Sequence, residues 1–239
     1  MDKRIVLPAL LNGKIQTEGQ FLAGSNFTFL VDVTYEQLEL KAVYKPVRGE
    51  QPLWDFPNGS LAKREAAAYV LSEALGWDLV PPTVYRRKGP MGAGSLQEFV
   101  QHEAHLHYFN FDEATRQHLR PVALFDLLAN NADRKGGHIL LDSTGRLLLI
   151  DHGICFHVED KLRTVVWDFA GEEIPANLRA DICRLIEDLE QESPKVLELH
   201  GLLAHGEIEA IVQRARQLDS SGHFPYPQST RRSYPWPPV

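Results

Sequence analysis

The chain has 239 residues, 44% of them hydrophobic, and a formal net charge of −7 at pH 7. This length and composition suffice for a buried core in one domain or in a two-lobed one, while the acidic balance argues against broad binding to nucleic acid or to anionic membrane. No run of about 18 apolar residues occurs, so we expect no transmembrane helix.

The first residues and the cysteines indicate an intracellular protein. The opening stretch, M-D-K-R-I-V-L-P-A-L-L-N-G, has a basic start, but Pro8 breaks its short apolar run. It also lacks a small-residue cleavage site, so we expect no signal peptide. Cys155 and Cys183 lie far apart without CxxC spacing, which fits a reduced cytosolic protein. We therefore expect a cytoplasmic location.

Residues 1–35 have the pattern of β-structure. After the turn Gly24-Ser25-Asn26, the residues Phe27, Phe29, Val31 and Val33 alternate with Thr28, Leu30 and Asp32. Alternation around such a turn is typical of a β-hairpin.

Residues 37–45 predict a further strand. Leu38, Leu40, Ala42 and Tyr44 fall on one face by alternation, whereas Val43 and Lys45 share the other. Pro46 follows, so the strand should end at Lys45. Taken alone, Lys45 is most simply a solvated lysine at a strand end.

A helix is expected from Ser60, as its N-cap, to about Leu75, before Gly76. Its apolar stripe is formed by Leu61, Ala68, Leu71 and Leu75. Glu65 lies at the edge of that stripe, where its carboxylate can face the sheet and pair with Lys45. The alternative is an exposed helix acid paired with Lys63 or Arg64.

The next segments complete the sheet and lead into helices. Residues 80–85 and 94–100 predict strands, and His102, His105 and His107 are expected to be surface histidines of a polar linker rather than metal ligands. Asp112 should cap one helical stretch, and Pro121 should open another over residues 122–130.

Residues 129–156 have the strongest pattern in the chain. The apolar runs around Asp142-Ser143-Thr144-Gly145 predict a β-hairpin, with Asp133 just before it and Asp151 at its far end. Because a hairpin folds back on itself, these acids should lie at the same end of it. Two such carboxylates can take a proton and hold Mg²⁺ against phosphate oxygens. The alternative is a hairpin with ordinary solvated acids at its ends.

The remainder predicts helices and a tail. Leu178, Ile182, Leu185 and Leu189 recur at helical spacing, another helix should begin at Ser193-Pro194, and residues 207–218 predict the last. Residues 223–239 are rich in proline and aromatic residues. They predict an extended tail packed against the body, or a strip that binds a partner protein.

The motifs D-R-K-G-G-H and I-D-H-G around the hairpin resemble the catalytic core of the phosphatidylinositol 3-/4-kinases, which carry D-R-H-x-x-N and I-D-F-G. With N-A-D-R-K-G-G-H, they are most similar to an uncharacterised bacterial family distantly related to those kinases. The resemblance is specific over residues 130–153 and looser over residues 20–100. A-V-Y-K, ending at Lys45, is similar to the V-A-I-K strand of kinases.

The resemblance implies a small, two-lobed α+β fold of the protein-kinase-like, phosphatidylinositol 3-/4-kinase-like kind. Residues 1–100 would form a β-rich lobe with one helix, residues 101–222 a mostly helical lobe with the catalytic hairpin, and residues 223–239 the tail. The cleft would bind ATP with Mg²⁺ or Mn²⁺ and transfer phosphate to an acceptor. A protein or a small molecule is favoured over a lipid, because the chain is short and acidic.

The resemblance also assigns roles to individual residues. The nucleotide would be bound by Ser25 and Asn26 at the phosphates, Val43 over the adenine, Lys45 on the phosphates, Glu65 holding Lys45, and the backbone near Glu98 and Val100 at the adenine edge. Asp133 would take the acceptor's proton, with Arg134 as structural or electrostatic support and Lys135 stabilising charge. Asp151 would be the principal metal ligand, with His138 beside it.

Three departures from the kinase pattern leave alternatives open. His138 stands where the resemblance places a metal-binding asparagine, Lys135 replaces a histidine, and His152 replaces an aromatic residue. One alternative is therefore a catalytically inactive nucleotide-binding protein or scaffold. Another is a zinc hydrolase using His138, Asp151, His152 and His157, although their spacing matches no zincin motif.

Overall fold

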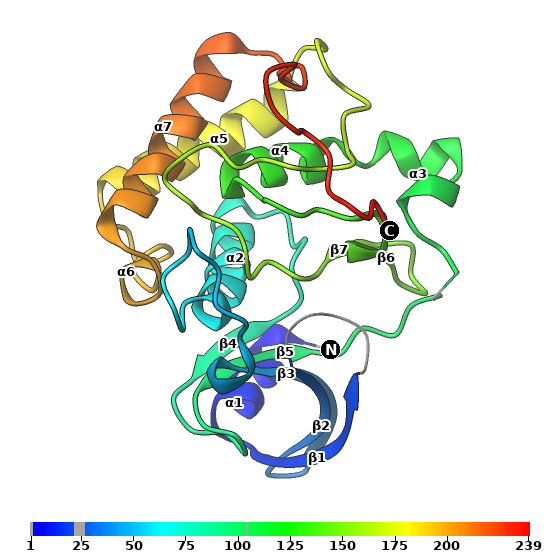
Figure 1. Cartoon of the computed structure of the whole chain (residues 1–239), viewed down its shortest axis with the longest axis vertical. Coiled ribbons are helices and arrows are strands. Elements are labelled where there is room, and N and C mark those ends of the chain that lie inside the picture. The colour runs from blue at the N-terminus through cyan, green and yellow to red at the C-terminus, as the bar shows by residue number, and fades with distance from the viewer. Residues whose placement is uncertain (1, 22–26, 104) are drawn as a thin grey trace.

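The computed structural model describes residues 2–21, 27–103 and 105–239. An antiparallel sheet lies at one end of the molecule and most of the helices lie at the other (Figure 1). The sheet has the strand order β1-β2-β3-β5-β4. Its strands are β1 (Lys14–Phe21), β2 (Thr28–Tyr35), β3 (Leu38–Pro46), β4 (Thr83–Arg86) and β5 (Gly94–Glu98).

Strand β3 follows the predicted alternation. Leu40, Ala42 and Tyr44 are buried, and Val43 and Lys45 on the opposite face are partly exposed. The register pairs Ala42 with Val31 and Leu40 with Val33, so apolar side chains meet across the strands. This alternation fixes the face of the sheet on which Lys45 lies.

The N-terminal segment corrects one prediction. Residues 3–12, expected to be β-structure, form the helix α1 (Lys3–Asn12), and the carboxylate of Asp2 caps it by accepting from the Arg4 amide at 2.9 Å. Val6, Ala9 and Leu10 have helical spacing and are fully buried in the cluster of the sheet. The described part of the first 100 residues therefore contains two α-helices, α1 and one that follows the third strand, where one helix was expected.

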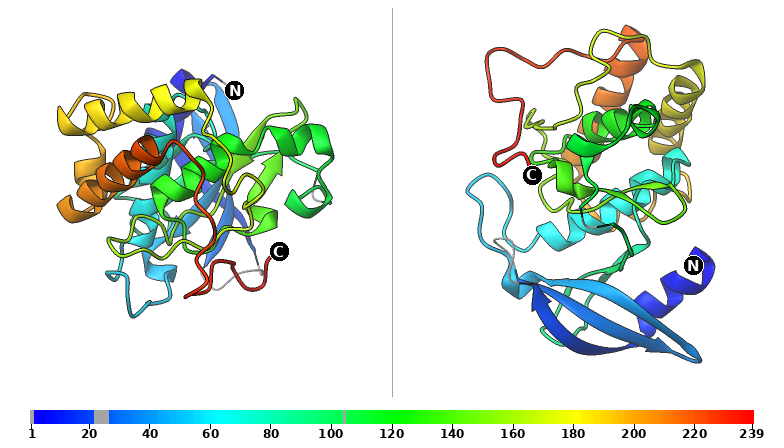
Figure 2. Two further views of the ribbon diagram at one scale, coloured as in Figure 1. Left: turned by 90° about the horizontal axis from the view of Figure 1, so that it is seen from above. Right: turned by 90° about the vertical axis from the view of Figure 1, so that its right-hand side faces the viewer.

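Helix α2 (Leu61–Leu75) lies between the sheet and the helices (Figure 2). It ends as predicted at Gly76, which has φ +71° in the left-handed region that favours glycine. Its start differs: the Ser60 hydroxyl donates to the Pro57 carbonyl at 2.6 Å instead of capping. The Glu50 carboxylate, from the preceding loop, accepts from the amides of Leu61 and Ala62 at 3.2 and 2.8 Å.

The helical end is built on one large apolar cluster, to which α2 also contributes. Its helices are α3 (Glu113–Gln117), α4 (Arg120–Ala129), α5 (Ala176–Glu190), α6 (Leu199–Leu202) and α7 (His205–Ser221), with a hairpin of β6 (Ile139–Leu141) and β7 (Leu147–Leu149). Asp112 caps α3 as predicted, and the four leucine and isoleucine residues predicted to face inward from α5 are buried. Helix α2 precedes residue 100 but packs in the same apolar cluster as the later helices. A boundary between two lobes at residue 100 therefore stays a prediction.

Arg64 ties α2 to the helical end. It is 1% exposed, donates to the Cys155 carbonyl at 2.6 Å and forms an ion pair with Glu207 at the start of α7. Breaking a buried ion pair by removing one partner costs about 3–5 kcal/mol. The position of α2 is therefore fixed by polar as well as apolar contacts.

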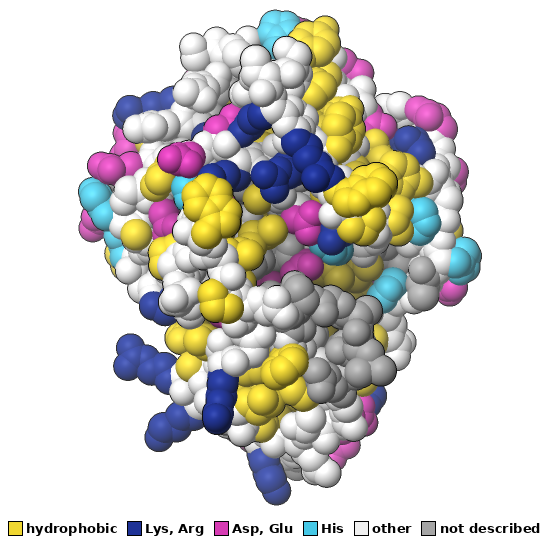
Figure 3. All heavy atoms as spheres, viewed as in Figure 1, with side chains coloured by type: hydrophobic (Ala, Val, Ile, Leu, Met, Phe, Trp, Pro, Cys, Tyr) yellow, Lys and Arg dark blue, Asp and Glu magenta, His cyan; other side chains and the backbone are white. Residues whose placement is uncertain are grey.

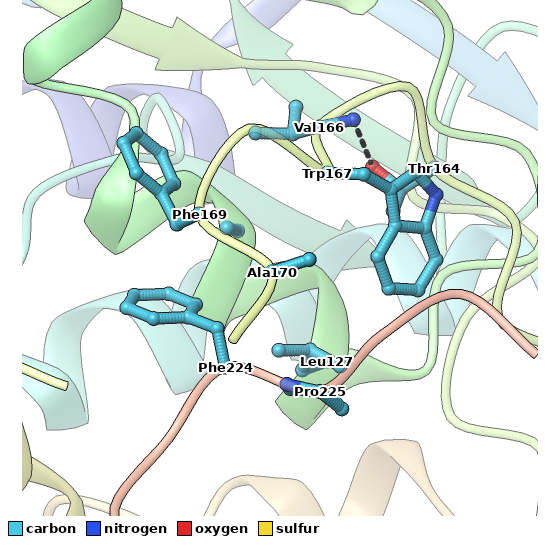
Figure 4. Close-up of a pocket in the computed structure, with 9 residues that line it drawn as sticks. Leu127, Thr164, Val166, Trp167, Phe169, Ala170, Phe224 and Pro225 are labelled. Carbon is cyan, nitrogen blue, oxygen red and sulfur yellow. Dashed lines mark hydrogen bonds between the residues drawn. The ribbon is translucent and has the colours of Figure 1, made fainter. Parts of the chain in front are cut away.

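The C-terminal tail packs along the body, as one of the two sequence-based alternatives predicted. Phe224 lies against Phe169, with ring centroids 5.6 Å apart (Figure 4). Further along, the Trp167 indole donates to the Ser233 carbonyl at 3.2 Å, and the Gly136 amide donates to the Pro238 carbonyl at 2.8 Å. The end of the tail thus reaches the loop that follows Asp133. Binding of a partner protein by the tail stays a prediction.

Among the described residues, no helix is both long and apolar enough to cross a bilayer.

Candidate active site

The predicted hairpin is present and brings the two acids to one end of it. Ile139 pairs with Leu149, and the Ile150 amide donates to the His138 carbonyl at 3.1 Å. At the other end of the hairpin, the Asp142 carboxylate accepts from the Thr144 amide at 2.8 Å and closes the turn. Asp133 and Asp151 therefore flank the open end of the hairpin, close enough for the charge of Asp151 to act on Asp133. The molecular surface is hollowed between the sheet and the helices, with acidic side chains at the hollow (Figure 3).

Lys45 lies between two carboxylates. It forms the predicted ion pair with Glu65 and donates to Asp151 Oδ1 at 2.9 Å. The Glu65 side chain is 4% exposed, and its second oxygen accepts from the His152 amide at 3.0 Å. One carboxylate of α2 thus holds both the strand lysine and the backbone next to Asp151.

Charge pairing sets the protonation of this group. Burial would lower the pKa of Lys45, but the charges of Asp151 and Glu65 outweigh it and raise that pKa. The positive charge of Lys45 in turn lowers the pKa of Asp151, against the effect of burial. At neutral pH the site therefore holds an ammonium group beside ionised Asp151, an arrangement suited to phosphate and metal together.

Asp133 lies in the neighbouring loop. Its amide donates to Asn131 Oδ1 at 2.9 Å, and its carboxylate lies 3.0 Å from the Lys135 ammonium. Burial raises the pKa of Asp133, opposed in part by the hydrogen bond and charge of Lys135. A raised pKa makes an aspartate a better proton acceptor than a fully solvated one.

His138 faces Asp151. Its Nε2 lies 3.4 Å from Asp151 Oδ2, and its Nδ1 lies 3.5 Å from the Lys135 amide. Burial lowers the pKa of His138 to about 4, so the imidazole is neutral at pH 7. In the tautomer with its proton on Nδ1, in place of the contact with the Lys135 amide, Nε2 would offer a lone pair to a metal ion. His138 Nε2 and Asp151 Oδ2 are close enough to each other to bind one metal ion together.

Two protein ligands fit an ion that takes its other ligands from nucleotide phosphates and water, as Mg²⁺ commonly does. No cluster of three histidine, cysteine or acidic side chains that could hold a metal occurs in the described part of the chain. The four residues of the zinc alternative, His138, Asp151, His152 and His157, form no such cluster. His157 contacts the Asp55 carbonyl at 2.9 Å, and His152 is fully buried beside Arg134.

Arg134 is fully buried and joins the loop that carries Asp133 to α4 and to the hairpin. Its Nε donates to Asp126 Oδ1 at 2.9 Å, and Nη1 donates to the Ile150 carbonyl at 2.8 Å. Nη2 lies 2.8 Å from His152 Nε2, which must accept because a guanidinium only donates. Arg134 is thus a positioning residue that holds the open end of the hairpin through the His138 and Ile150 carbonyls, and its burial keeps it from substrate.

The sequence analysis missed Asp126. This acid of α4 is fully buried and also accepts from the Thr164 hydroxyl at 2.8 Å and the Asn131 amide group at 3.3 Å. A single acid inside the apolar stretch V-A-L-F-D-L-L-A was the available signal, because a charged residue on the inward face of a helix needs a partner.

The nucleotide side of the site is less fully defined. Ser25 and Asn26 lie outside the described residues. Val43 is partly buried on β3, the Glu98 amide donates to the Pro82 carbonyl at 2.9 Å, and the Val100 carbonyl lies 3.0 Å from His102 Nδ1. Adenine contacts at Val43, Glu98 and Val100 therefore stay predictions.

Comparisons with known proteins agree with this geometry. The family model described as "Phosphatidylinositol 3- and 4-kinase" matches residues 59–203, more than half of the chain, including Glu65, Asp133 and Asp151. Protein Rv2133c of Mycobacterium tuberculosis is 40% identical over 95% of this chain and 93% of its own length. Phosphatidylinositol 4-kinase gamma 4 of Oryza sativa subsp. japonica is 32% identical over 46% of this chain, which spans 22% of that protein.

Two solved structures with similar folds are those of kinases. The Helicobacter pylori proinflammatory kinase CtkA has a TM-score of 0.52 at 11% identity, over 90% of this chain and 94% of that one. The Golgi casein kinase with Mn/ADP bound has a TM-score of 0.54 at 15% identity, over 91% and 74%. At such identities the likeness shows the fold alone, which is kinase-like. The family model, which matches more than half of the chain, shows that the chain belongs to the phosphatidylinositol 3- and 4-kinase family.

Proposed function

We propose that the chain transfers the γ-phosphate of ATP, with Mg²⁺ or Mn²⁺, to a protein or small-molecule acceptor. The observation that carries the proposal is Lys45 held between Glu65 and Asp151, at the end of the hairpin that also carries Asp133. These side chains would supply a cation for the phosphates, an oxygen donor for a metal and a proton acceptor, which supports phosphate transfer.

Each residue has a role that follows from its contacts. Lys45 orients the phosphates, and Glu65 fixes Lys45 against the sheet. Asp151 and His138 would hold the metal ion, which when bound neutralises charge on the phosphates. The Asp133 carboxylate accepts the proton of the acceptor's hydroxyl, and the nearby ammonium of Lys135 stabilises negative charge.

Two observations bear on the ligands. The net charge of −7 disfavours an anionic lipid surface, which supports a protein or small-molecule acceptor. The Golgi casein kinase, similar in fold, has Mn/ADP bound in its structure, which supports nucleotide and divalent-metal use by this chain.

Titration with ATP and either metal tests the proposal. A ligand that binds the folded chain raises its melting temperature, so we expect a metal-dependent shift with millimolar ATP. We expect γ-phosphate release or transfer by the wild type and none by Asp151→Ala. Equal turnover by the two proteins would exclude this site as its source, and the absence of any shift would exclude nucleotide binding.

The metal preference should depend on His138. Nitrogen ligands favour Mn²⁺ over Mg²⁺, so turnover should be higher with Mn²⁺, and His138→Asn should move the preference toward Mg²⁺. Assays of both proteins with each metal give the ratio. An unchanged ratio in His138→Asn would remove His138 from the metal site.

A second candidate function is nucleotide binding without transfer. Two observations favour it: Lys135 is paired with the proposed proton acceptor Asp133, and His138 stands at the second metal position. The same experiments separate the two functions, because an inactive protein would show the ATP-dependent thermal shift without phosphate release.

A further inference from the structure

A cavity lies between α7 and the C-terminal tail. Its volume is about 400 Å³, within the range of roughly 300–1,000 Å³ that is usual for small-molecule sites. Leu127, Trp167 and Pro225 form an apolar wall that it shares with the narrow crevice shown in Figure 4. None of the described active-site residues lines this cavity.

Arg214 of α7 lines the cavity with part of its guanidinium unused. Nε donates to the Leu128 carbonyl at 2.9 Å and Nη1 to the His157 carbonyl at 3.4 Å. Nη2 is buried without a hydrogen-bond partner among the described residues, and no carboxylate in that part of the chain lies within ion-pair distance. Burial lowers the pKa of Arg214 to about 10, the result of a cation held away from water.

Arg231 of the tail lines the same cavity. It forms an ion pair with Asp160, Nη2 to Oδ1 at 2.5 Å, while its Nε is buried and has no hydrogen-bond partner in the described chain. Asp160 also accepts from Gln228 at 3.1 Å. The wall thus contains two guanidinium groups against one carboxylate, which leaves an excess of positive charge and two buried donor nitrogens, Arg214 Nη2 and Arg231 Nε, without a partner in the described chain.

A buried, unsatisfied charged donor costs free energy, and an oxyanion is the partner that guanidinium groups fit best. The apolar wall would accept the uncharged part of a ligand. We propose that this cavity binds a small molecule that carries a phosphate group, held between Arg214 and Arg231.

Such a ligand would join two parts of the molecule that border the catalytic loop. Arg214 holds the Leu128 carbonyl near the end of α4, ahead of Asp133. Beyond Arg231, the tail accepts from the Thr164 amide through Ser233 and from the Gly136 amide through Pro238. Bridging the two arginines would therefore fasten the tail on the loop that carries Asp133.

Calorimetric titration of the full chain with inorganic phosphate, without metal or nucleotide, tests the site. We expect saturable binding of one phosphate per chain. Arg214→Gln and Arg231→Gln should each weaken it about tenfold or more, because each removes a charge-assisted hydrogen bond. Arg214→Lys keeps the positive charge but lacks the paired N–H donors of the guanidinium, so it should weaken binding less than Arg214→Gln. Circular dichroism checks that each variant is folded.

Two controls locate the site. Arg232→Gln removes the same charge from the next tail residue, which is exposed and donates to the Tyr234 carbonyl, and should leave the affinity unchanged. Lys45→Met should also leave it unchanged, which separates this cavity from the nucleotide cleft and makes the result independent of the proposed activity.

Three results would overturn the proposal: no saturable binding at millimolar phosphate, full affinity in folded Arg214→Gln and Arg231→Gln, or loss of binding in Lys45→Met that circular dichroism shows to be folded. Citrate binding in place of phosphate would overturn the ligand class, since it would assign the cavity to carboxylates.

Discussion

Lys45 neutralises two carboxylates at once, and one of them, on Glu65, is buried. We expect Lys45→Met to lower turnover about 100-fold or more, since it removes a cation preorganised for the phosphates. It should also destabilise the fold by about 3 kcal/mol, because Glu65 loses its partner in a buried position. Steady-state kinetics and denaturant unfolding measure the two effects.

Lys41→Met is the matched control on the same strand. Lys41 forms ion pairs with Glu18 and Asp32 at the surface, where solvent screens the charges, so its loss should change neither turnover nor unfolding appreciably. Similar destabilisation by the two substitutions would show that Glu65 does not depend on Lys45.

The raised pKa of Asp133 predicts the pH dependence of turnover. The carboxylate is the active form, so activity should fall as pH drops through this pKa, which burial raises above the ordinary value of an aspartate. Lys135 holds the pKa down, so Lys135→Met should raise it and move the acid limb to higher pH. The pH profile of kcat for both proteins measures the shift.

Lys161→Met serves as the control for that profile. Lys161 pairs with Asp55 and Glu159, outside the candidate site, and its loss should leave the acid limb in place. If the acid limb of the pH profile also stays in place in Lys135→Met, the titrating group is not Asp133.

At the scale of one element, α2 depends on a distant cap. The Glu50 carboxylate satisfies two of its first amides, so Glu50→Ala should cost about 1 kcal/mol of stability. Ser60→Ala should cost less, because the Ser60 hydroxyl bonds to Pro57 instead of the helix. Chemical unfolding of the two variants gives the order, and a larger loss from Ser60→Ala would reverse the assignment of the cap.

Elements with a local pattern were predictable from the sequence. Strand β3, the end of α2 at Gly76 and the hairpin β6–β7 each carry their periodicity and turn residues within a few positions. Helix α1 was assigned wrongly, because Pro8 and the neighbouring alternation hid the helical spacing of Val6, Ala9 and Leu10. The cap by Glu50 was missed because it lies 11 positions before Leu61.

The candidate site shows the same limit. Lys45 and Glu65 were placed together because strand parity and a helix stripe are local properties, and the structure confirms their ion pair. Asp126 was missed because its partner, Arg134, becomes visible only after α4 packs behind the hairpin. Sequence patterns thus located the groups that face the hollow better than the groups that support them.

At the scale of the whole molecule, net charge bears on the acceptor. A chain with a charge of −7 is repelled by anionic bilayers at low salt, so we expect no cosedimentation with vesicles rich in acidic phospholipid. Neutral vesicles provide the baseline. Retention on the acidic vesicles above that baseline would contradict our preference for a protein or small-molecule acceptor.

The fixing of α2 has a consequence for control. In protein kinases, the position of the corresponding helix and its glutamate is one means of switching activity. Here Arg64, next to Glu65, joins α2 to Glu207 and to the Cys155 carbonyl within the interior. For the proposed phosphotransferase, moving this helix would mean breaking the core. The rate of phosphate transfer would then depend on how much of the protein is synthesised and how much acceptor the cell supplies.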